Sequence, residues 1–496
     1  MKLANIPIHN IPYSKFVQDY QYAIFAMINY KYKNTNILIE DFIMIEKVFI
    51  GCGAGFSGDR FDASIPIVKE FKNINAPKYL MFEVLAERTL AIAQQFRLKN
   101  PEEGYSPFLD SYISPILDDC LENNIKIISN IGAANPMGAA KRILEIAKKQ
   151  NTKKPTIGVV LGDDLLDYMS NDEILDSPTM EGLDFSNNKI TAANVYLGAQ
   201  PIAEALKKGA DIVIVGRTVD SALALGPLLY EFKWKQNELD LIGSGTICGH
   251  LLECGAQVTG AYFADPGFKD VPDLANVGFP IAEVSQDGSF VITKPEETGG
   301  LVSKATVTEQ LLYETHDPSN YLVPDVTADM TSLTLENNGK NRILVQGGKG
   351  KKSPEKLKAT ICCDNGFMGE AEISYAGPNA LARAKLAGEV ISERIQILGL
   401  QGQLRVEIIG AGSVHYSMNE TSSYQLPENG DYRVRTSAIY PKKDQAQQMV
   451  DEVMSLYCCG PAAGGGGRGY VTPQSSTASI LVNRDTVEPH IQIKII

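Results

Sequence analysis

The sequence lacks the excess of positive charge that binding to nucleic acid or to an anionic membrane requires. Lysine and arginine contribute 46 residues against 59 aspartates and glutamates, so the formal net charge is −13. A surface of this sign repels phosphate backbones and acidic headgroups. We therefore expect neither nucleic acid nor a membrane as a partner.

Cysteine and histidine are also scarce. The eight cysteines form no C-x-x-C pair, and 362/363 and 458/459 are sequence neighbours, which is poor disulfide geometry. With five histidines in addition, a structural zinc finger or ribbon is excluded. A reducing compartment is the simplest explanation for this cysteine usage.

The chain has no long apolar run and no secretory signal pattern. The apolar patch at 22–30 is short, follows Lys15 and Asp19, and lacks the basic start and small-residue cleavage site of a signal peptide. No later run approaches the roughly 18 apolar residues of a membrane span. We expect a soluble, cytoplasmic protein.

What the sequence contains is ordinary globular composition, with 44% hydrophobic residues in 496 positions, enough for two or three domains. After an N-terminal extension, 1–46, short apolar runs alternate with helical patterns up to residue 260, which is typical of parallel βαβ units. The sequence predicts an α/β fold with a parallel sheet and helices on both faces over 47–260. The expected strands are 47–50, 79–82, 126–129, 156–161 and 211–215, and the expected helices include 65–71, 86–97, 137–149 and 201–208.

The alternation of short apolar runs with helical patterns ends after residue 260. Glycine and proline punctuate 261–358, which we expect to be an irregular connecting region with short strands. Over 359–496 the order β-α-β-β-α, closed by a terminal strand at 490–495, predicts an α+β domain of the ferredoxin-like type. Its expected elements are 370–375, 379–396, 403–409, 432–440 and 443–457.

Polar residues follow each of the five expected strands. Ligands of open parallel sheets bind beyond the carboxyl ends of the strands, so these residues are candidate ligand contacts. Any one of them could instead be a helix cap or a turn, as Asp163 and Asn135 before Pro136 illustrate. In strand order they are Ser57, Asp59 and Arg60, then Glu83, then Asn130 and Asn135, then Asp163, and last Arg217 and Asp220.

A Gly53-x-Gly55-x-x-Gly58 spacing matches the dinucleotide fingerprint. Asp59 and Asp62 occupy the position where a pyrophosphate needs an uncompensated helix N-terminus, so they would repel it. A nicotinamide- or flavin-binding loop is a weak alternative here, and a tight structural turn explains the glycines about as well.

Four polar residues, His250, Glu253, Cys254 and Gln257, have the spacing of one helical face. Histidine suits proton transfer near neutral pH, and a glutamate one turn away could set its tautomer or raise its pKa. A capped helix start with a satisfied histidine is an equal alternative. A metal would need a further ligand that the sequence does not identify, so no metal site is predicted.

Near the end, four consecutive glycines precede Arg468. Such a run costs conformational entropy, which favours close approach of a ligand or of another backbone to Gly465 and Gly466. Arg468 would suit a carboxylate or a phosphate. A flexible surface loop is the alternative reading.

Five strings together carry a family resemblance. They are GCGAGFSGDR at 51–60, FEVLAER at 82–88, NIGAANP at 130–136, GHLLECGAQVTG at 249–260 and GPAAGGGG at 460–467. In this order they resemble the acyclic terpene utilisation (AtuA) family, from about Lys47 to the C-terminus. The resemblance implies a role in the breakdown of acyclic terpenes and branched-chain acids, beside acyl-CoA carboxylases, dehydrogenases and hydratases. It implies a pathway more firmly than a reaction.

Two features depart from the family pattern. Residues 1–43 have no counterpart in it, and many relatives carry a further small C-terminal domain that this chain does not show. If that domain contributes to the activity, a separate partner protein must supply it.

Three hypotheses follow. The first is a lyase- or hydratase-like enzyme acting on a branched carboxylic acid or its coenzyme A thioester by acid/base chemistry. Its catalytic candidates are Glu83, His250, Glu253 and Asn130, and Arg217 and Arg60 would hold the carboxylate or thioester oxygen. The second is a non-catalytic accessory protein of an acyl-CoA carboxylase or hydratase complex, and the third is a nicotinamide-dependent dehydrogenase. The cofactor is open, and self-association into a homo-oligomer is the default expectation.

Overall fold

The structure is a computed structural model that describes residues 45–185, 189–412 and 430–496. The predicted extension 1–46 lies almost entirely outside the described residues. Lys47–Ile496 form one compact unit, whose described residues contain a ten-stranded sheet, a five-stranded sheet and a small three-stranded sheet. The strands of the small sheet are, in spatial order, β13 (Lys349–Lys351), β10 (Thr327–Asp329) and β9 (Tyr321–Leu322).

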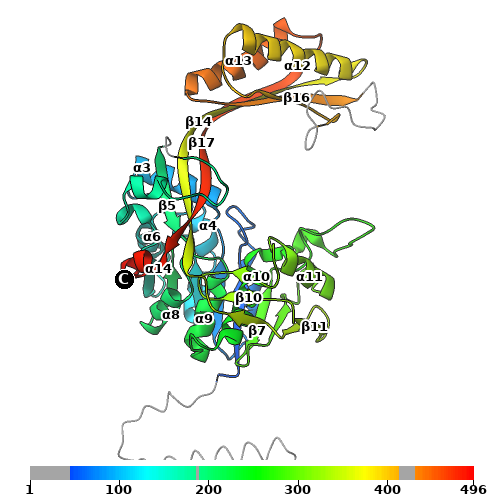
Figure 1. The fold of residues 1–496 in the computed structure, drawn as a ribbon. Helices are drawn as coiled ribbons and strands as arrows, with labels where there is room; N and C mark the ends of the chain where they lie inside the picture. The colour runs from blue at the N-terminus through cyan, green and yellow to red at the C-terminus, as the bar shows by residue number, and fades with distance from the viewer. Residues whose placement is uncertain (1–44, 186–188, 413–429) are drawn as a thin grey trace, which may run out of the picture. The chain divides into compact units, whose positions relative to one another are not determined.

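Five parallel strands lie at the centre of the larger sheet (Figure 1). Each is rich in β-branched and aliphatic residues, as strands buried on both faces are. They pair side by side in parallel register, which confirms the five predicted strands. In spatial order they are β1 (Lys47–Cys52), β2 (Lys78–Phe82), β3 (Ile125–Ser129), β6 (Ile212–Ile214) and β4 (Ile157–Leu161).

Antiparallel strands extend this sheet at both edges, so that it is mixed. Four of them come from the region 261–358 and continue outward from β1. The fifth, β18 (Gln492–Ile495), pairs with β4 at the other edge. The four strands beside β1 are β7 (Ile281–Ser285), β8 (Phe290–Thr293), β12 (Ile343–Gln346) and β11 (Thr334–Asn337).

Helices cover the parallel strands on both faces, because successive side chains of a strand point to opposite sides. Leu80 and Phe82 of β2 belong to a core shared with one set of helices. Tyr79, which precedes Leu80 and points to the other face, donates a hydrogen bond to Glu231 on the opposite side. The first set is α2 (Ser64–Phe71), α4 (Leu109–Ile113), α5 (Leu117–Glu122) and α6 (Pro136–Gln150); the second is α8 (Gln200–Lys207), α9 (Ala222–Phe232) and α10 (Leu239–Glu253).

A second sheet is built on two long strands, β14 (Lys356–Ala376) and β17 (Gly465–Asn483), which pair along most of their length. The first part of β14 also pairs with β5 (Ile190–Val195), a strand that the sequence reading missed. The second part pairs with β16 (Asp431–Tyr440), which in turn pairs with β15 (Arg405–Ile409).

The C-terminal part of this sheet carries two helices, α12 (Ala380–Ile397) and α13 (Lys443–Cys459). Ile373 and Tyr375 of β14 share a buried core with Ile391 of α12 and Met449 of α13. The order β14-α12-β15-β16-α13-β17 follows the predicted alternation of strands and helices, and the strand order in the sheet is β15-β16-β14-β17.

The prediction that residues 490–495 close this C-terminal layer is wrong, since β18 belongs to the larger sheet. The closing strand is β17, which begins at Gly465 in the glycine run. Glycine brings no side chain to signal a strand, and the backbone here is pressed against its neighbours: a Cβ on Gly467 would lie 2.8 Å from the Tyr457 ring.

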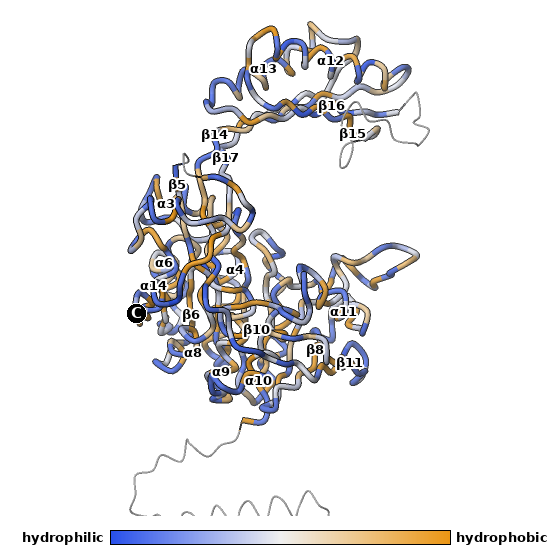
Figure 2. The backbone as a smooth tube through the Cα atoms, in the orientation of Figure 1, coloured by the Kyte–Doolittle hydropathy of each residue, from blue (hydrophilic) through white to orange (hydrophobic). Residues whose placement is uncertain are grey.

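Within the described ranges no helix combines the length and hydropathy needed to cross a bilayer. In Figure 2 hydrophobic stretches concentrate along the inner strands near β6, and hydrophilic ones along the outer turns. The remaining α-helices are α3 (Glu87–Lys99), α7 (Asn171–Leu175), α11 (Lys304–Leu312) and α14 (Arg484–Val487).

Candidate functional site

A cavity of about 1390 Å³ lies beyond the carboxyl ends of β1, β2 and β6. Parallel strands deliver their following loops to one edge of a sheet, so residues distant in sequence meet there. The loop after β1 contributes Ser57 and Asp59, the loop after β2 contributes Glu83, and the loop after β6 contributes Arg217 and Asp220. The end of α10, the strand β9 and the start of β14 complete the wall.

Glu83 is held by a buried amide from the neighbouring strand. Its Oε1 accepts hydrogen bonds from Asn130 Nδ2 and from the backbone N–H of Leu85, each at 2.9 Å. Asn130 is fixed in turn because its Oδ1 accepts the Val84 N–H at 2.8 Å. Burial, and after it the Asp220 carboxylate, raises the pKa of Glu83 well above its usual value.

Arg217 is the buried cation beside these carboxyls, and both of its terminal nitrogens are bound within the protein, whereas its Nε has no hydrogen-bond partner among the described residues. One guanidinium nitrogen donates to the Leu85 carbonyl, and Nη2 donates to Asp220 Oδ1 at 3.3 Å. The guanidinium carbon lies 4.0 Å from the centre of the Tyr196 ring, a cation–π contact. Burial lowers the pKa of Arg217, but the surrounding acids, Asp220 first, outweigh it and keep the group charged.

Asp220 titrates near neutrality. Burial raises its pKa to about 7, against the opposing effect of Arg217. A carboxyl with a pKa close to the working pH can both take and return a proton.

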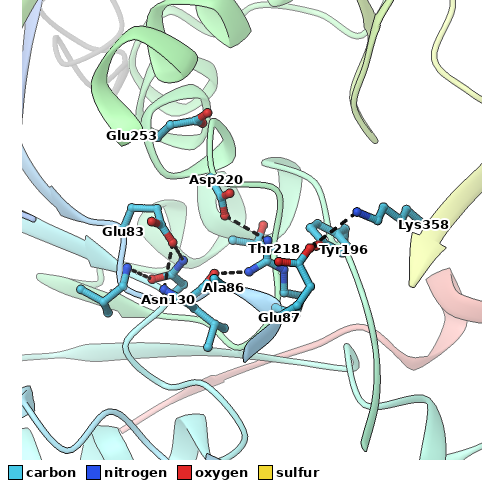
Figure 3. Close-up of polar contacts among 12 residues, drawn as sticks. Glu83, Ala86, Glu87, Asn130, Tyr196, Thr218, Asp220, Glu253 and Lys358 are labelled. Carbon is cyan, nitrogen blue, oxygen red and sulfur yellow. Dashed lines mark hydrogen bonds and ion pairs between the residues drawn. The ribbon is translucent and has the colours of Figure 1, made fainter. Parts of the chain in front are cut away.

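Glu87 behaves in the opposite way although it stands only four residues from Glu83 in the chain. Tyr196 donates a hydrogen bond to Glu87, and Lys358 Nζ lies 3.6 Å from Glu87 Oε1 (Figure 3). Burial raises the pKa of Glu87, yet Arg217 and the Tyr196 hydrogen bond outweigh it and bring the pKa down to about 2. The cavity therefore holds Glu87, whose pKa is lowered, beside acids whose pKa is raised, and such divergent pKa values are typical of acid/base sites.

His250 stands behind the cavity wall rather than in it. It is 1% exposed, and its Nδ1 lies 3.0 Å from Glu253 Oε1 and 3.5 Å from the Tyr321 hydroxyl. Glu253 and Tyr321 line the cavity. Burial lowers the pKa of His250, but Glu253 more than compensates and raises it above its usual value. This geometry suits a residue that orients Glu253.

The prediction that a helix begins at this segment and continues to Gln257 is wrong, because α10 ends at Glu253. Cys254 is the residue after the helix and Gln257 lies in a following turn, so the four polar residues do not share one helical face. The helix ends where the backbone must pass Gly55, whose added Cβ would come within 2.3 Å of the Cys254 carbonyl carbon. The glycine thus allows two cavity-lining segments to touch.

The loop after β1 folds onto its own aspartate. Asp59 accepts the N–H of Gly55 at 2.9 Å and that of Arg60 at 2.7 Å. Burial raises the pKa of Asp59. The amides that would meet a pyrophosphate are thus partly occupied, which supports the structural-turn interpretation of the three glycines.

Several predicted site residues are placed away from the cavity lining. Asn135 caps α6 by accepting the Gly138 N–H at 2.9 Å. Asp163 accepts from Asn194 and from the backbone N–H of Arg217 at 2.8 Å, so it supports the Arg217 loop. Arg60 pairs with Asp62 and donates to the Ala275 carbonyl.

The glycine-rich candidates lie in the C-terminal layer. Gly465 and Gly466 begin β17, and Gly465 stands opposite Ser374 of β14. Arg468 pairs with Glu372 on the neighbouring strand. None of the three is among the residues that line the cavity.

Sequence reasoning missed three residues of the site, namely Tyr196, Tyr321 and Lys358. Glu87 follows the second strand in the same FEVLAER string as Glu83, but it is not among the predicted site residues. Tyr196 follows the missed strand β5, and Tyr321 and Lys358 come from β9 and β14. Only long-range pairing brings these to the edge of the parallel sheet.

Among the described residues, no group of three or more histidines, cysteines, aspartates and glutamates is arranged to hold a metal ion. Comparison with known proteins gives one match: residues 48–493 fit the model of the acyclic terpene utilisation family protein AtuA. No curated protein and no solved structure matches the chain.

Proposed function

The chain belongs to the acyclic terpene utilisation family, which indicates a role in terpene and acyl catabolism, and on that premise we propose that it is an acid/base enzyme. Its substrate is a branched carboxylic acid or the corresponding thioester. The reaction is addition or removal of water, or cleavage of a carbon–carbon bond.

The observation that carries this proposal is the pair Glu83 and Asp220. Both face one cavity and both have a raised pKa, whereas the adjacent Glu87 stays ionised. A scaffold gains nothing from placing two acids beside a single buried arginine, since desolvation of these groups costs free energy that one cation offsets only in part.

In the proposed mechanism the two carboxyls divide the proton transfers. Asp220, ionised in part near neutral pH, removes the proton from the carbon beside the substrate carbonyl. Glu83, protonated because it is buried, delivers its proton to the departing hydroxyl, which leaves as water. The reverse sequence hydrates the double bond.

Two roles expected from the sequence change in this proposal. The Asn130 amide is already bound to Glu83 and Val84, so it positions the acid rather than a substrate oxygen. Arg217 has its donors on Leu85 and Asp220, so it sets the charge of the site. His250 acts through Glu253 and is likewise a positioning residue.

The test is turnover of branched acids and thioesters by the full chain, compared with the double variant Glu83→Gln/Asp220→Asn. We expect conversion by the unmodified protein and none detectable in the double variant. Glu122→Gln, an exposed residue at the end of α5, is the control and should retain full activity. A double variant as active as the control would rule out the enzyme and leave the accessory role.

We also infer that the C-terminal layer is ferredoxin-like. The β-α-β-β-α-β order and the sheet order β15-β16-β14-β17, with β14 as the first and β17 as the last strand of the layer, support this. In such a layer two helices pack on one face and the other stays open, so it is a candidate surface for self-association.

A further inference from the structure

The charge of the cavity bears on which form of the substrate it accepts. Acidic residues outnumber basic ones along its wall. Deep in the site stand Glu83, Asp220 and Glu253, and Figure 3 shows the three side chains gathered around the same space. The basic lining residues are Arg88, Arg217, Lys356 and Lys358.

None of these cations is placed to receive a carboxylate beside Glu83. Arg217 is 2% exposed and its terminal nitrogens are engaged by Leu85 and Asp220. Lys358 stands over the Tyr196 ring and beside Glu87. Arg88 and Lys356 are exposed residues of the rim.

Part of the cavity lining is apolar. Five large side chains that line the cavity are exposed, which would be costly in an empty, permanently hydrated site. A hydrocarbon chain lying along them would remove this surface from water. They are Phe56, Met180, Tyr262, Leu322 and Leu481.

We propose that the substrate presents an uncharged carbonyl, as a thioester does, to Glu83 and Asp220, and that a free carboxylate is excluded. The hydrocarbon chain lies along the apolar wall, and the carrier attached to the carbonyl leaves past the rim. This inference rests on the proposed function and decides between the two substrate forms named there.

Repulsion is the physical basis of the exclusion. A free carboxylate placed at the carbonyl position would share the cavity with Asp220 and Glu253, and Arg217, the buried cation there, is already paired with Asp220. A thioester of the same chain meets the same apolar wall without that repulsion.

The experiment measures dissociation constants of the full chain near neutral pH for three probes with one acyl chain. They are octanoate, the octanoyl thioester of N-acetylcysteamine, and octanoyl-CoA. We expect both thioesters to bind at least about tenfold more tightly than octanoate, the size of one modest charge repulsion. Octanoate binding as tightly as the thioesters, or no detectable thioester binding, would overturn the proposal.

Comparing the two thioesters identifies the kind of carrier group that is attached to the substrate carbonyl. If octanoyl-CoA binds more tightly than the N-acetylcysteamine thioester, and Lys356→Ala removes that difference, the carrier is an anionic one held at the rim. Equal binding of the two identifies a small or uncharged carrier. Both results agree with an uncharged carbonyl.

Asp220→Asn separates this inference from the proposed function. The variant should bind octanoate more tightly while thioester binding stays the same, because a repelling charge has been removed. Glu122→Gln should change neither. If Asp220→Asn keeps full turnover while the thioester preference holds, the catalytic assignment fails and the ligand assignment stands; unchanged octanoate binding in Asp220→Asn contradicts the repulsion itself.

Discussion

Two regions of this molecule place glutamates and arginines side by side, with opposite electrostatic results. In the cavity, Glu83 and Asp220 share one buried Arg217, and burial raises the pKa of both acids. On the open face of the C-terminal layer, Arg435 alone bridges Glu370 at 2.9 Å and Glu407 at 2.8 Å.

The difference comes from the number of donors and from access to water. Glu370 is half-buried, and its hydrogen bond to the charged Arg435 outweighs burial and lowers its pKa. Glu83 receives its hydrogen bonds from neutral donors, which do not offset the loss of water. The same residue types therefore make a stabilising ion-pair ladder in one place and a proton-exchanging site in the other.

Replacing Glu83 by glutamine should have the largest effect and should separate activity from stability. Turnover should fall by about 10² to 10⁴, because general acid catalysis contributes on that scale. Folding should be retained or improved, since a buried acid is replaced by a neutral amide of the same shape. Turnover and the thermal unfolding midpoint are measured on the same preparation.

Glu370→Gln is the matched control for this comparison. It removes an equivalent carboxylate from the C-terminal layer and should leave turnover unchanged. Equal loss of turnover in both variants would mean that the cavity is not where catalysis occurs.

The pH profile should show an acidic limb at the pKa of Asp220. That pKa is raised to about 7, and the base form is needed for proton removal, so kcat/KM should fall about tenfold per pH unit below about 7. The measurement is kcat/KM between pH 4 and 9. A limb near pH 4, the ordinary range of an aspartate, would show that Asp220 is not the base.

Arg435→Met should destabilise the protein by about 1 to 3 kcal/mol, because it leaves the carboxylate of Glu407 without one of its partners. Glu407 is 4% exposed, so water cannot replace the lost partner. Arg405 still reaches Glu407, which keeps the loss moderate. Thermal unfolding measures it, and turnover of the folded variant should be normal. An unchanged unfolding midpoint would show that the ladder contributes no stability.

Local sequence patterns predict some features of the fold and of the site but not others. The five parallel strands and the residues at their ends, Glu83, Arg217 and Asp220 among them, follow from local patterns and from one rule about parallel sheets. Asn135 and Asp163 satisfied the same rule but serve as cap and support, because the side chain alone does not say which neighbour it will bind. Tyr196 follows β5, whose partner β14 lies more than a hundred residues away, and β17 also pairs with the distant β14. Tyr321 contacts His250, 71 residues away in the chain. No local pattern encodes such contacts.

The smallest expected effect concerns stability against pH, where the two regions should have opposite signs. The pKa of Glu370 is lowered by folding, so its contribution is present above the unfolded pKa and is lost as the pH falls through the folded value. Glu83 has a raised pKa, so ionised Glu83 destabilises the fold at high pH, and stability increases as the pH falls toward the unfolded value.

Denaturant unfolding at pH 7 and pH 4 should therefore show Glu370→Gln less stable than the unmodified chain by less than about 1 kcal/mol at pH 7, with the gap closing at pH 4. Glu83→Gln should be more stable than the unmodified chain at pH 7, again with the gap closing at pH 4. Gaps of the same sign in the two variants would mean that burial does not distinguish the two regions, and the acid/base assignment of Glu83 would lose its physical basis.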